Sequence, residues 1–434
     1  MTNYIEQILD EKKFINGIYV PWLDKDWFGF DIGKNVQDNY NKCFFNEPYI
    51  KSVFTNCKAI GFDMAKIWLN EAFEGMLFDK DGSVIGVEPT FLENLEKVFK
   101  IIKDLDFKLS ICVNAHQEMC FPNDKSLYDK YMRFVYIPEE TEKYITNWLI
   151  PILQLAQKYG CVPLVDLYAE PEADGGGWKV SRGFSWKTMV RFINRLHVAV
   201  KDFDPMFATT VSSGSACYTL IQGMYSEVNV DYLGADLYTD DGKFDTPKSM
   251  LLSRPFMLGE YGLSNYKTAT KEDQVRIVKA YINNALNNQV AAAFYWCYGW
   301  KCRKSDEMHL VDREGELKPV AAYYHFSQLD RQYNTNEVAQ NDKPVLLAIV
   351  SHQRIRWFGT RGAKYYKVLR IKNNLTENIA IIEDNNDNVD YPLIFRYNDE
   401  QGDDSCSYQI ISVMPDGQEI FSDAADVIKG AIYK

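Results

Sequence analysis

Short apolar runs alternate with long amphipathic stretches through about the first 330 residues of this 434-residue chain. In the amphipathic stretches, apolar side chains recur at three- and four-residue steps, as in helices that bury one face. Repetition of this kind predicts βα units around a parallel sheet. The expected strands are residues 14–20, 59–69, 108–114, 163–169, 207–212, 232–235, 256–259 and 291–295, and the expected helices include 89–105, 141–159, 186–202 and 271–288.

Eight parallel strands alternating with helices is the strand count of a (β/α)₈ TIM barrel, an α/β fold that places function at the carboxyl ends of its strands. A doubly wound open sheet is the alternative, and it usually carries a glycine-rich phosphate-binding turn after its first strand. The segment that follows the first expected strand begins Pro21-Trp22 and contains no glycine up to Trp27. We therefore predict a barrel over residues 1–332.

The sequence pattern changes after Gln332. Residues 333–344 are polar and hold three asparagines and a proline, which predicts a linker. Beyond the linker, alternating or aromatic-rich runs are separated by turn clusters, and this spacing predicts a small β-sandwich over residues 345–434. The expected strands are residues 345–350, 365–371, 379–383, 392–397 and 406–413.

The end of this sandwich, residues 407–413 followed by Asp416 and Gly417, resembles the last two strands of a fibronectin type III domain. The resemblance implies a domain that braces or spaces the barrel, because fibronectin-like domains have no fixed sugar site. A carbohydrate-binding module is the alternative.

Charge and cysteine content limit the partners and the compartment. The net charge of −12 argues against an extended basic surface for nucleic acid, and no apolar stretch is long enough to span a membrane. The nine cysteines are scattered without a C-x-x-C pair, and the first 13 residues lack the apolar core of a signal peptide, so we expect a cytoplasmic protein. A secreted chain whose signal peptide had been removed would carry the same features.

No cofactor is indicated. The five histidines lie far apart in the sequence without metal-ligand spacing, and no phosphate-loop or serine-hydrolase motif occurs. The sequence does not indicate an oligomeric state. Aromatic residues make up 14% of the chain, which suits either a thick core or a groove that stacks on the apolar faces of sugars.

Two glutamates follow the fourth and seventh expected strands. Glu170 comes after residues 163–169 and Glu260 after residues 256–259. In a closed barrel these strand ends face each other across the mouth, where two carboxyl groups about 5–5.5 Å apart could carry out glycoside hydrolysis with retention. One acid donates its proton to the departing oxygen and the other attacks the anomeric carbon as a carboxylate. Glu172, two residues after Glu170, is the alternative proton donor.

With these residues the chain resembles the clan A glycoside hydrolases, and within them the cellulase- and mannanase-like members of glycoside hydrolase family 5 and relatives. The resemblance spans about residues 14–332 and rests on the run 256–262 (Phe-Met-Leu-Gly-Glu-Tyr-Gly), on Lys66-Ile67-Trp68-Leu69, on Tyr295-Trp296 and on the turn 312–319. It implies a retaining enzyme of β-glucan or β-mannan type that uses a carbohydrate substrate.

The resemblance also implies roles for individual residues. Glu170 would be the acid/base, Glu260 the nucleophile, Tyr238 a hydroxyl near the nucleophile and Trp296 a platform under the cleaved sugar, while His116 would be a hydrogen-bonding wall residue. The residues that would contact the substrate are Trp22, Lys66, Trp68, Asn114, His116, Glu172, Tyr238 and Trp296.

This chain departs from the family pattern at two positions. Ala169 stands where the family usually has the asparagine that binds the sugar 2-hydroxyl, and Lys66 stands nearest to the position of an arginine that grips the nucleophile. A catalytically silent sugar-binding protein on the same scaffold is therefore the alternative function. Asn46-Glu47-Pro48 spells the usual acid/base motif, but it follows no sufficient strand and lies between the first two strands, on the wrong side of the mouth.

Overall fold

A computed structural model describes most of the chain, and its residues separate by spatial contact into two compact units. The first unit is Met1–Phe45, Asp63–Ala269 and Arg276–His309, and the second is Asn46–Phe62, Thr270–Val275 and Leu310–Lys434. The described residues are 2–21, 32–34, 45–70, 73–115, 125–175, 185–214, 224–244, 255–263, 270–299, 308–312, 315–332, 342–385 and 394–431.

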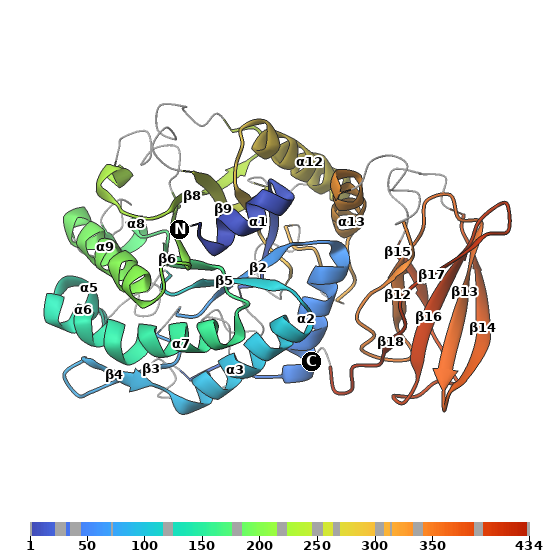
Figure 1. Ribbon diagram of the computed structural model, residues 1–434, viewed down its shortest axis with the longest axis horizontal. Helices are drawn as coiled ribbons and strands as arrows, with labels where there is room; N and C mark the ends of the chain where they lie inside the picture. Colours follow the sequence, from blue (N-terminus) through green and yellow to red (C-terminus); the bar gives the residue numbers. More distant parts are fainter. Residues whose placement is uncertain are drawn as a thin grey trace. The chain divides into compact units, whose positions relative to one another are not determined.

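The first unit is built around a closed barrel of eight parallel strands, as predicted (Figure 1). Around the barrel the strands follow the order β1-β10-β9-β8-β7-β6-β5-β2, so each strand pairs with its neighbour in the chain and the last returns to the first. The strands are β1 (Ile15–Tyr19), β2 (Met64–Trp68), β5 (Lys108–Cys112), β6 (Leu164–Ala169), β7 (Ala208–Ser213), β8 (Tyr232–Thr239), β9 (Phe256–Leu263) and β10 (Ala292–Tyr295).

Three strand boundaries differ from the prediction by four or more residues, and one of them is the end of β8, which runs past Ala235 to Thr239. The other two are the start of β2 and the end of β9. The expected strand 59–69 begins only at Met64, because residues 59–60 end helix α2 (Glu47–Ile60), and Gly61 caps that helix at a φ of 96°. A positive φ is a backbone conformation that glycine adopts without steric cost. At its end, β9 runs past Gly259 to Leu263, so Glu260 lies inside the strand.

Helices connect the strands where the periodicity predicts them. The expected helices 89–105, 186–202 and 271–288 are confirmed as α3 (Pro89–Asp104), α9 (Trp186–Phe203) and α12 (Lys271–Asn287). The expected helix 141–159 begins earlier, as α6 (Pro138–Tyr144), and continues through a π-helical turn (Ile145–Leu149) into α7 (Ile150–Tyr159). Shorter elements are α4 (Lys125–Tyr131), α5 (Arg133–Tyr136), α8 (Glu172–Gly175), a 3₁₀ turn (Met224–Glu227) and the hairpin of β3 (Met76–Phe78) with β4 (Val84–Val87).

The amino-terminal helix α1 (Tyr4–Lys12) packs on the barrel. Its first turn is stabilised by Asn3, whose side chain accepts from the Glu6 amide while the Glu6 side chain accepts from the Asn3 amide. Ile5 of α1 is fully buried in the same cluster as Ile15 and Met64, which begin β1 and β2. The helix therefore covers apolar side chains at the amino-terminal ends of the strands.

The barrel interior is apolar at the start of the strands and polar further along. Gly17 leaves room for an aromatic ring, because a Cβ there would stand 2.3 Å from the ring of Phe294. Further along, the side chains of Lys66, Asp166 and Ser212 are fully or almost fully buried. Buried charges are costly unless they are paired, so this polar layer indicates a functional site inside the barrel.

The second unit contains the predicted β-sandwich. One sheet has the order β11-β12-β15, with strands β11 (Val345–Leu346), β12 (Ile355–Phe358) and β15 (Ile394–Tyr397). The other has the order β14-β13-β16-β17, and β18 (Ala425–Asp426) also pairs with β16. Its strands are β13 (Tyr365–Lys372), β14 (Leu375–Glu383), β16 (Ser407–Val413) and β17 (Glu419–Phe421). Trp357 and Phe395 of the first sheet and Tyr366 of the second lie in one core, whereas β12, β17 and β18 were not predicted.

Helices α2 and α13 (Pro319–Gln332) belong to the second unit. The side chain of Asn56 on α2 accepts a hydrogen bond from the Ala348 amide over 2.8 Å. His325 on α13 stacks on Phe358 with ring centres 4.4 Å apart. The predicted boundaries at 332 and 345 stay a prediction, and residues 333–341 of the expected linker lie outside the described part of the chain.

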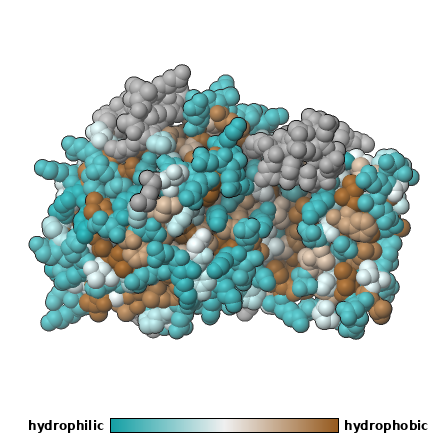
Figure 2. All heavy atoms as spheres, in the orientation of Figure 1, coloured by the Kyte–Doolittle hydropathy of each residue, from teal (hydrophilic) through white to brown (hydrophobic). Residues whose placement is uncertain are grey.

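No described helix is long and apolar enough to cross a membrane. Figure 2 shows hydrophilic and hydrophobic residues interspersed over the face that it draws.

The acid/base-like motif Asn46-Glu47-Pro48 is a helix start. Asn46 is the N-cap of α2, and its side chain accepts a hydrogen bond from the Tyr49 amide over 3.0 Å. Pro48 lies in the first turn, where proline is favoured because the missing N–H would have no helical partner. Helix capping explains the motif without catalysis.

Candidate active site

The two candidate acids lie on the strands that the sequence predicts. In chain order β6 is the fourth barrel strand and β9 the seventh. Glu170 follows directly after β6, and Glu260 lies in the second half of β9. Both positions are at the carboxyl-terminal end of the barrel, the end where TIM barrels carry their active sites.

Glu260 is held in place by an irregularity of β9. The register with β8 shifts at this point, so that Asp236 pairs with Glu260 and Gly259 is the extra residue. A Cβ at Gly259 would stand 2.1 Å from Oγ of Ser212 and 2.5 Å from Oδ1 of Asp236. Glycine is therefore required next to Glu260, because two polar side chains approach the backbone there.

Tyr238 binds Glu260 directly. The Tyr238 hydroxyl donates a hydrogen bond to Oε2 of Glu260 over 2.5 Å. Glu260 is 5% exposed, so this bond lies in a largely desolvated environment where it stabilises the carboxylate more than it would in water. Burial raises the pKa of Tyr238, and the adjacent Glu260 raises it further, so the tyrosine stays a donor.

Glu170 has an unusual backbone conformation. Its φ is 51°, in the left-handed region that non-glycine residues rarely adopt. Its amide donates to the carbonyl of Ser212 over 2.8 Å, which ties the end of β6 to β7. Its side chain lies against Gly214, where a Cβ would stand 2.3 Å from Oε1 of Glu170. Strained backbone of this kind is common at functional sites.

Asp236 shows that the two glutamates share one environment. Its pKa is raised well above the usual value, first by burial and then by Glu260 and Glu170. Tyr238 also has its pKa raised by both glutamates, after burial. Both oxygens of Asp236 are buried without a hydrogen-bond partner in the described residues. Burial and the neighbouring carboxylates thus favour the protonated form of Asp236.

Lys66 is buried and paired with Asp166. Its Nζ lies 2.5 Å from Oδ2 of Asp166 and donates to Oγ of Ser212 over 3.3 Å, and the side chain is 1% exposed. It also lies 4.8 Å from the centre of the Tyr19 ring. Burial is the largest single effect and would lower the pKa of Lys66, but Asp166, Cys112 and Asp236 together outweigh burial and the pKa is raised, so the lysine is charged.

Three aromatic rings meet at the ends of β1, β2 and β10. Trp296 lies with its ring centre 5.1 Å from that of Tyr19 and 5.3 Å from that of Trp68. Trp296 is partly exposed, whereas Tyr19 and Trp68 are buried. The geometry leaves Trp296 as the ring that can contact a ligand, supported from behind by the other two.

Two of the expected substrate contacts are fully buried within the protein. Oδ1 of Asn114 accepts from Asn70 and from the Tyr144 hydroxyl, and its Nδ2 donates to the carbonyl of Leu167. Glu172 is 0% exposed, and its Oε1 accepts from the Ser213 hydroxyl. Trp22 and His116 lie outside the described residues.

Sequence reasoning missed the buried polar residues Asp166, Ser212 and Asp236 and the ring of Tyr19. A signal for Asp166 and Asp236 was present, since each is a charged residue within a largely apolar strand. Ser212 gave no such signal, because β7 contains two threonines and two serines. The ion pair of Lys66 with Asp166 could not be predicted, because it joins strands that are not adjacent in the sequence.

The described residues hold no group of three or more histidine, cysteine, aspartate or glutamate side chains arranged as metal ligands. Ala169, which takes the place of the family's asparagine, is fully buried.

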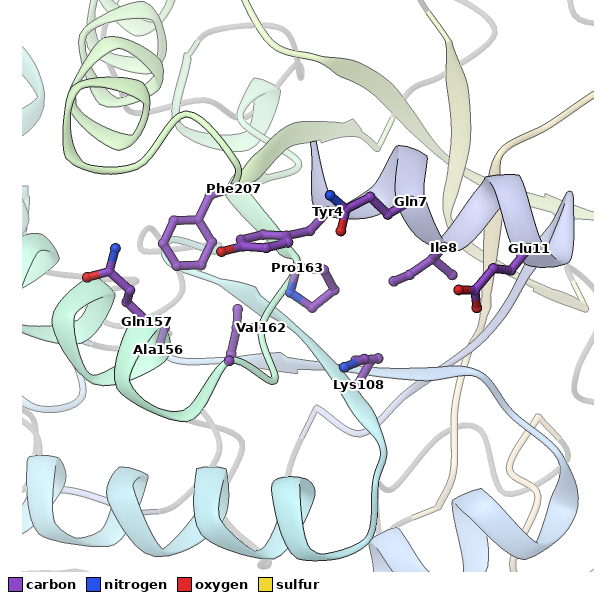
Figure 3. A pocket seen from close by; sticks show the side chains of 11 residues that line it. Tyr4, Gln7, Ile8, Glu11, Lys108, Ala156, Gln157, Val162, Pro163 and Phe207 are labelled. Carbon is purple, nitrogen blue, oxygen red and sulfur yellow. The ribbon is translucent and has the colours of Figure 1, made fainter. Parts of the chain in front are cut away.

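A pocket of about 270 Å³ lies at the opposite end of the strands (Figure 3). Its lining includes Tyr4 and Gln7 of α1, Lys108 at the start of β5 and Pro163 and Phe207, which precede β6 and β7. Because residues at this end of a TIM barrel contribute mainly to stability, we place the candidate site at the other end, with the two glutamates.

Comparison with known proteins identifies the fold. No protein-family model and no curated protein sequence matches the chain. Among solved structures, an endo-1,4-β-mannanase from Eisenia fetida matches with a TM-score of 0.51 at 16% identity, over 68% of this chain and 88% of the mannanase. A β-mannanase from the blue mussel Mytilus edulis matches with a TM-score of 0.50 at 15% identity, over 66% of this chain and 88% of that chain. At such identities these likenesses establish a shared fold.

Proposed function

We propose that this protein is a retaining glycoside hydrolase that cleaves β-linked glycans or oligosaccharides by double displacement. The observation that carries the proposal is the pair of glutamates on the fourth and seventh barrel strands, both of which act on the pKa of Asp236 and of Tyr238. Two carboxyl groups in one environment can hold different protonation states, which the reaction requires.

The residues divide the chemistry between them. Glu260 attacks the anomeric carbon as a carboxylate, and Glu170 donates its proton to the departing glycosidic oxygen. The resulting glycosyl–enzyme ester is cleaved by water, from which Glu170 now takes a proton. The bond from Tyr238 favours the ionised form of Glu260, and Trp296 offers an apolar ring to the C–H face of the sugar.

For the substrate we propose a β-mannan- or β-glucan-type chain. The proposal is supported by the fold shared with two β-mannanases and by the motifs in the sequence. The exposed part of the site contains an aromatic ring and carboxylates, which suits a neutral sugar with several hydroxyl groups.

A catalytically silent sugar-binding protein is the second candidate, and two observations favour it. Ala169 cannot bind a sugar 2-hydroxyl, and Lys66 is neutralised by Asp166 rather than presented to Glu260. On this reading the carboxylates and Trp296 would bind a sugar without cleaving it.

Turnover measurements separate the two candidates. The full chain is incubated with manno- and cello-oligosaccharides and with the matching aryl β-glycosides, and the first anomer formed is identified by NMR. We expect hydrolysis with retention, lost in Glu260→Gln by far more than the roughly 10²–10⁴-fold effect of proton transfer alone. Glu139→Gln, an exposed glutamate on α6, is the matched control and should keep full activity. Binding of these sugars without any turnover would favour the silent protein.

A further inference from the structure

An acid occupies every second position of the segment after β6, at Glu170, Glu172 and Asp174, and the last two are fully buried. Glu172 and Asp174 are each 0% exposed, whereas Glu170 between them and the strand is partly exposed. Burying a carboxyl group is costly unless hydrogen bonds compensate it. The two buried acids are therefore expected to accept hydrogen bonds, and their donors show which parts of the chain they hold in place.

Glu172 is bound to the end of β7. The Ser213 hydroxyl donates a short hydrogen bond to Oε1 of Glu172, and the Gly214 amide donates to Oε2 over 3.4 Å. Burial raises the pKa of the neighbouring Tyr225, and the charge of Glu172 raises it further. The two oxygens of Glu172 thus accept from Ser213, the last residue of β7, and from Gly214, which follows it.

Asp174 is held by two tyrosines. The Tyr168 hydroxyl on β6 donates to Oδ2 over 2.5 Å, and the Tyr128 hydroxyl on α4 donates a short hydrogen bond to Oδ1. This arrangement folds the segment back onto the strand from which it comes. The segment is therefore fixed on both sides of Glu172.

Glu170 contacts the same short segment, and it shares Gly214 with Glu172. Its amide is bonded to the Ser212 carbonyl, and its carboxyl group lies against the backbone of Gly214. Its left-handed backbone is unfavourable for a residue with a side chain and persists only where the surroundings determine it. The hydrogen bonds that Ser213 and Gly214 donate to Glu172 fix the surroundings of Glu170.

We propose that Glu172 is a positioning residue that holds Glu170 in proton-donating geometry by fixing Ser213 and Gly214, and that it does not contact the substrate itself. The inference rests on the proposed glycosidase function. Ser213 and Gly214 donate to different oxygens of Glu172, and glutamine carries an NH₂ donor in place of one of these oxygens, so it loses one of the two bonds.

The test compares two aryl β-glycosides of one sugar, with phenyl and with 2,4-dinitrophenyl as leaving group. Only the poor leaving group, phenol, needs a proton from Glu170 as its bond breaks. For Glu172→Gln we expect kcat/KM on the phenyl glycoside to fall about 10²-fold and kcat/KM on the dinitrophenyl glycoside to fall less than about fivefold. The ratio kcat/KM reports the step in which the leaving group departs, and not the later hydrolysis of the glycosyl–enzyme, which needs Glu170 as a base for both substrates. The basic limb of the pH profile for the phenyl glycoside should also move.

Two further variants keep the test decisive. Glu140→Gln alters a buried glutamate of α6 that pairs with Arg133 and Lys143, and it should affect both substrates by the same factor. Ser213→Ala removes one bond to Glu172 and should reproduce the leaving-group-selective loss if Glu172→Gln does not fold. An equal loss on both substrates would overturn the positioning role. If the wild type turns over neither substrate, the proposed function is overturned, and the role of Glu172 with it.

Discussion

The hydroxyl of Tyr238 stands 2.5 Å from Oε2 of Glu260, across the pairing of β8 with β9. A donor at this distance stabilises the carboxylate form of Glu260, because hydrogen bonding to the charged form favours ionisation. Glu260, the proposed nucleophile, and its donor Tyr238 are thus fixed by adjacent strands rather than by a loop, and this arrangement gives the first prediction.

Tyr238→Phe should lower kcat/KM by about 10–100-fold, the effect of losing one hydrogen bond to a charged group. Loss of the donor raises the pKa of Glu260, so the acid limb of the pH–rate profile should move to higher pH. Tyr159→Phe is the matched control, because Tyr159 donates to the carboxylate of Glu96 over 3.0 Å away from the site. An unchanged acid limb in Tyr238→Phe would contradict the nucleophile assignment.

Asp236→Asn should stabilise the protein at neutral pH. Asp236 has a raised pKa in the folded state, because of burial and the two glutamates, so its ionisation costs more in the folded protein than in the unfolded chain. This cost is absent below the unfolded-state pKa of about 4 and grows as the pH rises. The gain in melting temperature over the wild type should therefore be small at pH 4 and larger at pH 7.

Thermal unfolding of both proteins across this pH range measures the effect. Asp202→Asn, at an exposed position of α9, serves as the control and should give a nearly constant difference. Destabilisation by Asp236→Asn at pH 7 would mean that Asp236 is ionised and needed as a charge.

Gly214→Ala should fold and lose activity. The new Cβ would stand 2.3 Å from Oε1 of Glu170, and the group that must move is the end of the Glu170 side chain rather than backbone. A displacement of about 1 Å can cost roughly 10²-fold in rate, so we expect a loss of that order on substrates with poor leaving groups. Gly86→Ala on β4 is the control, since its Cβ meets nothing nearer than 3.8 Å. Full activity of Gly214→Ala would argue against Glu170 as the acid.

His325 should make the protein less stable in mild acid. Burial lowers the pKa of His325 to about 4, and its Nε2 is buried without a hydrogen-bond partner among the residues that the structure describes. The unfolded chain takes up a proton at a pKa of about 6.5, so stability should fall as the pH drops from about 6.5 to 4, by about 2–3 kcal/mol. His325→Phe keeps the ring against Phe358 and removes the titration.

Denaturant unfolding at several pH values measures this effect. The free energy of unfolding of His325→Phe should vary less between pH 4 and 6.5 than that of the wild type, whatever its absolute value. Identical pH dependence in the two proteins would show that His325 does not titrate in this range.

The barrel could be predicted from the sequence because its signals are local. Each strand is a short apolar run, and each helix has a repeated apolar face, so all eight strands were found within a few residues of their bounds. The error at β2 arose because the apolar end of α2 runs almost directly into the strand. In the sandwich, β12 (Ile355–Phe358) was missed because Arg356 is buried there through its bonds to Gly315 and Glu316.

The candidate site was predictable only in part. Glu170 directly follows β6 and Glu260 lies in the second half of β9, so their placement at one end of the barrel followed from strand order. The environment of each acid depends on contacts between distant segments, such as Gly214 beneath Glu170 and Asp236 beside Gly259. Periodicity within a segment carries no information on such contacts.

The buried ion pair of Lys66 with Asp166 also constrains how the chain can assemble. These residues come from β2 and β6, which are separated by β5 in the sheet and by about a hundred residues in the sequence. A half-barrel that enclosed Lys66 before β6 arrived would bury an ammonium group without its counter-ion, at a cost of several kcal/mol. Partly closed barrels are therefore penalised, and a fragment that ends before β6 should not fold as an independent half.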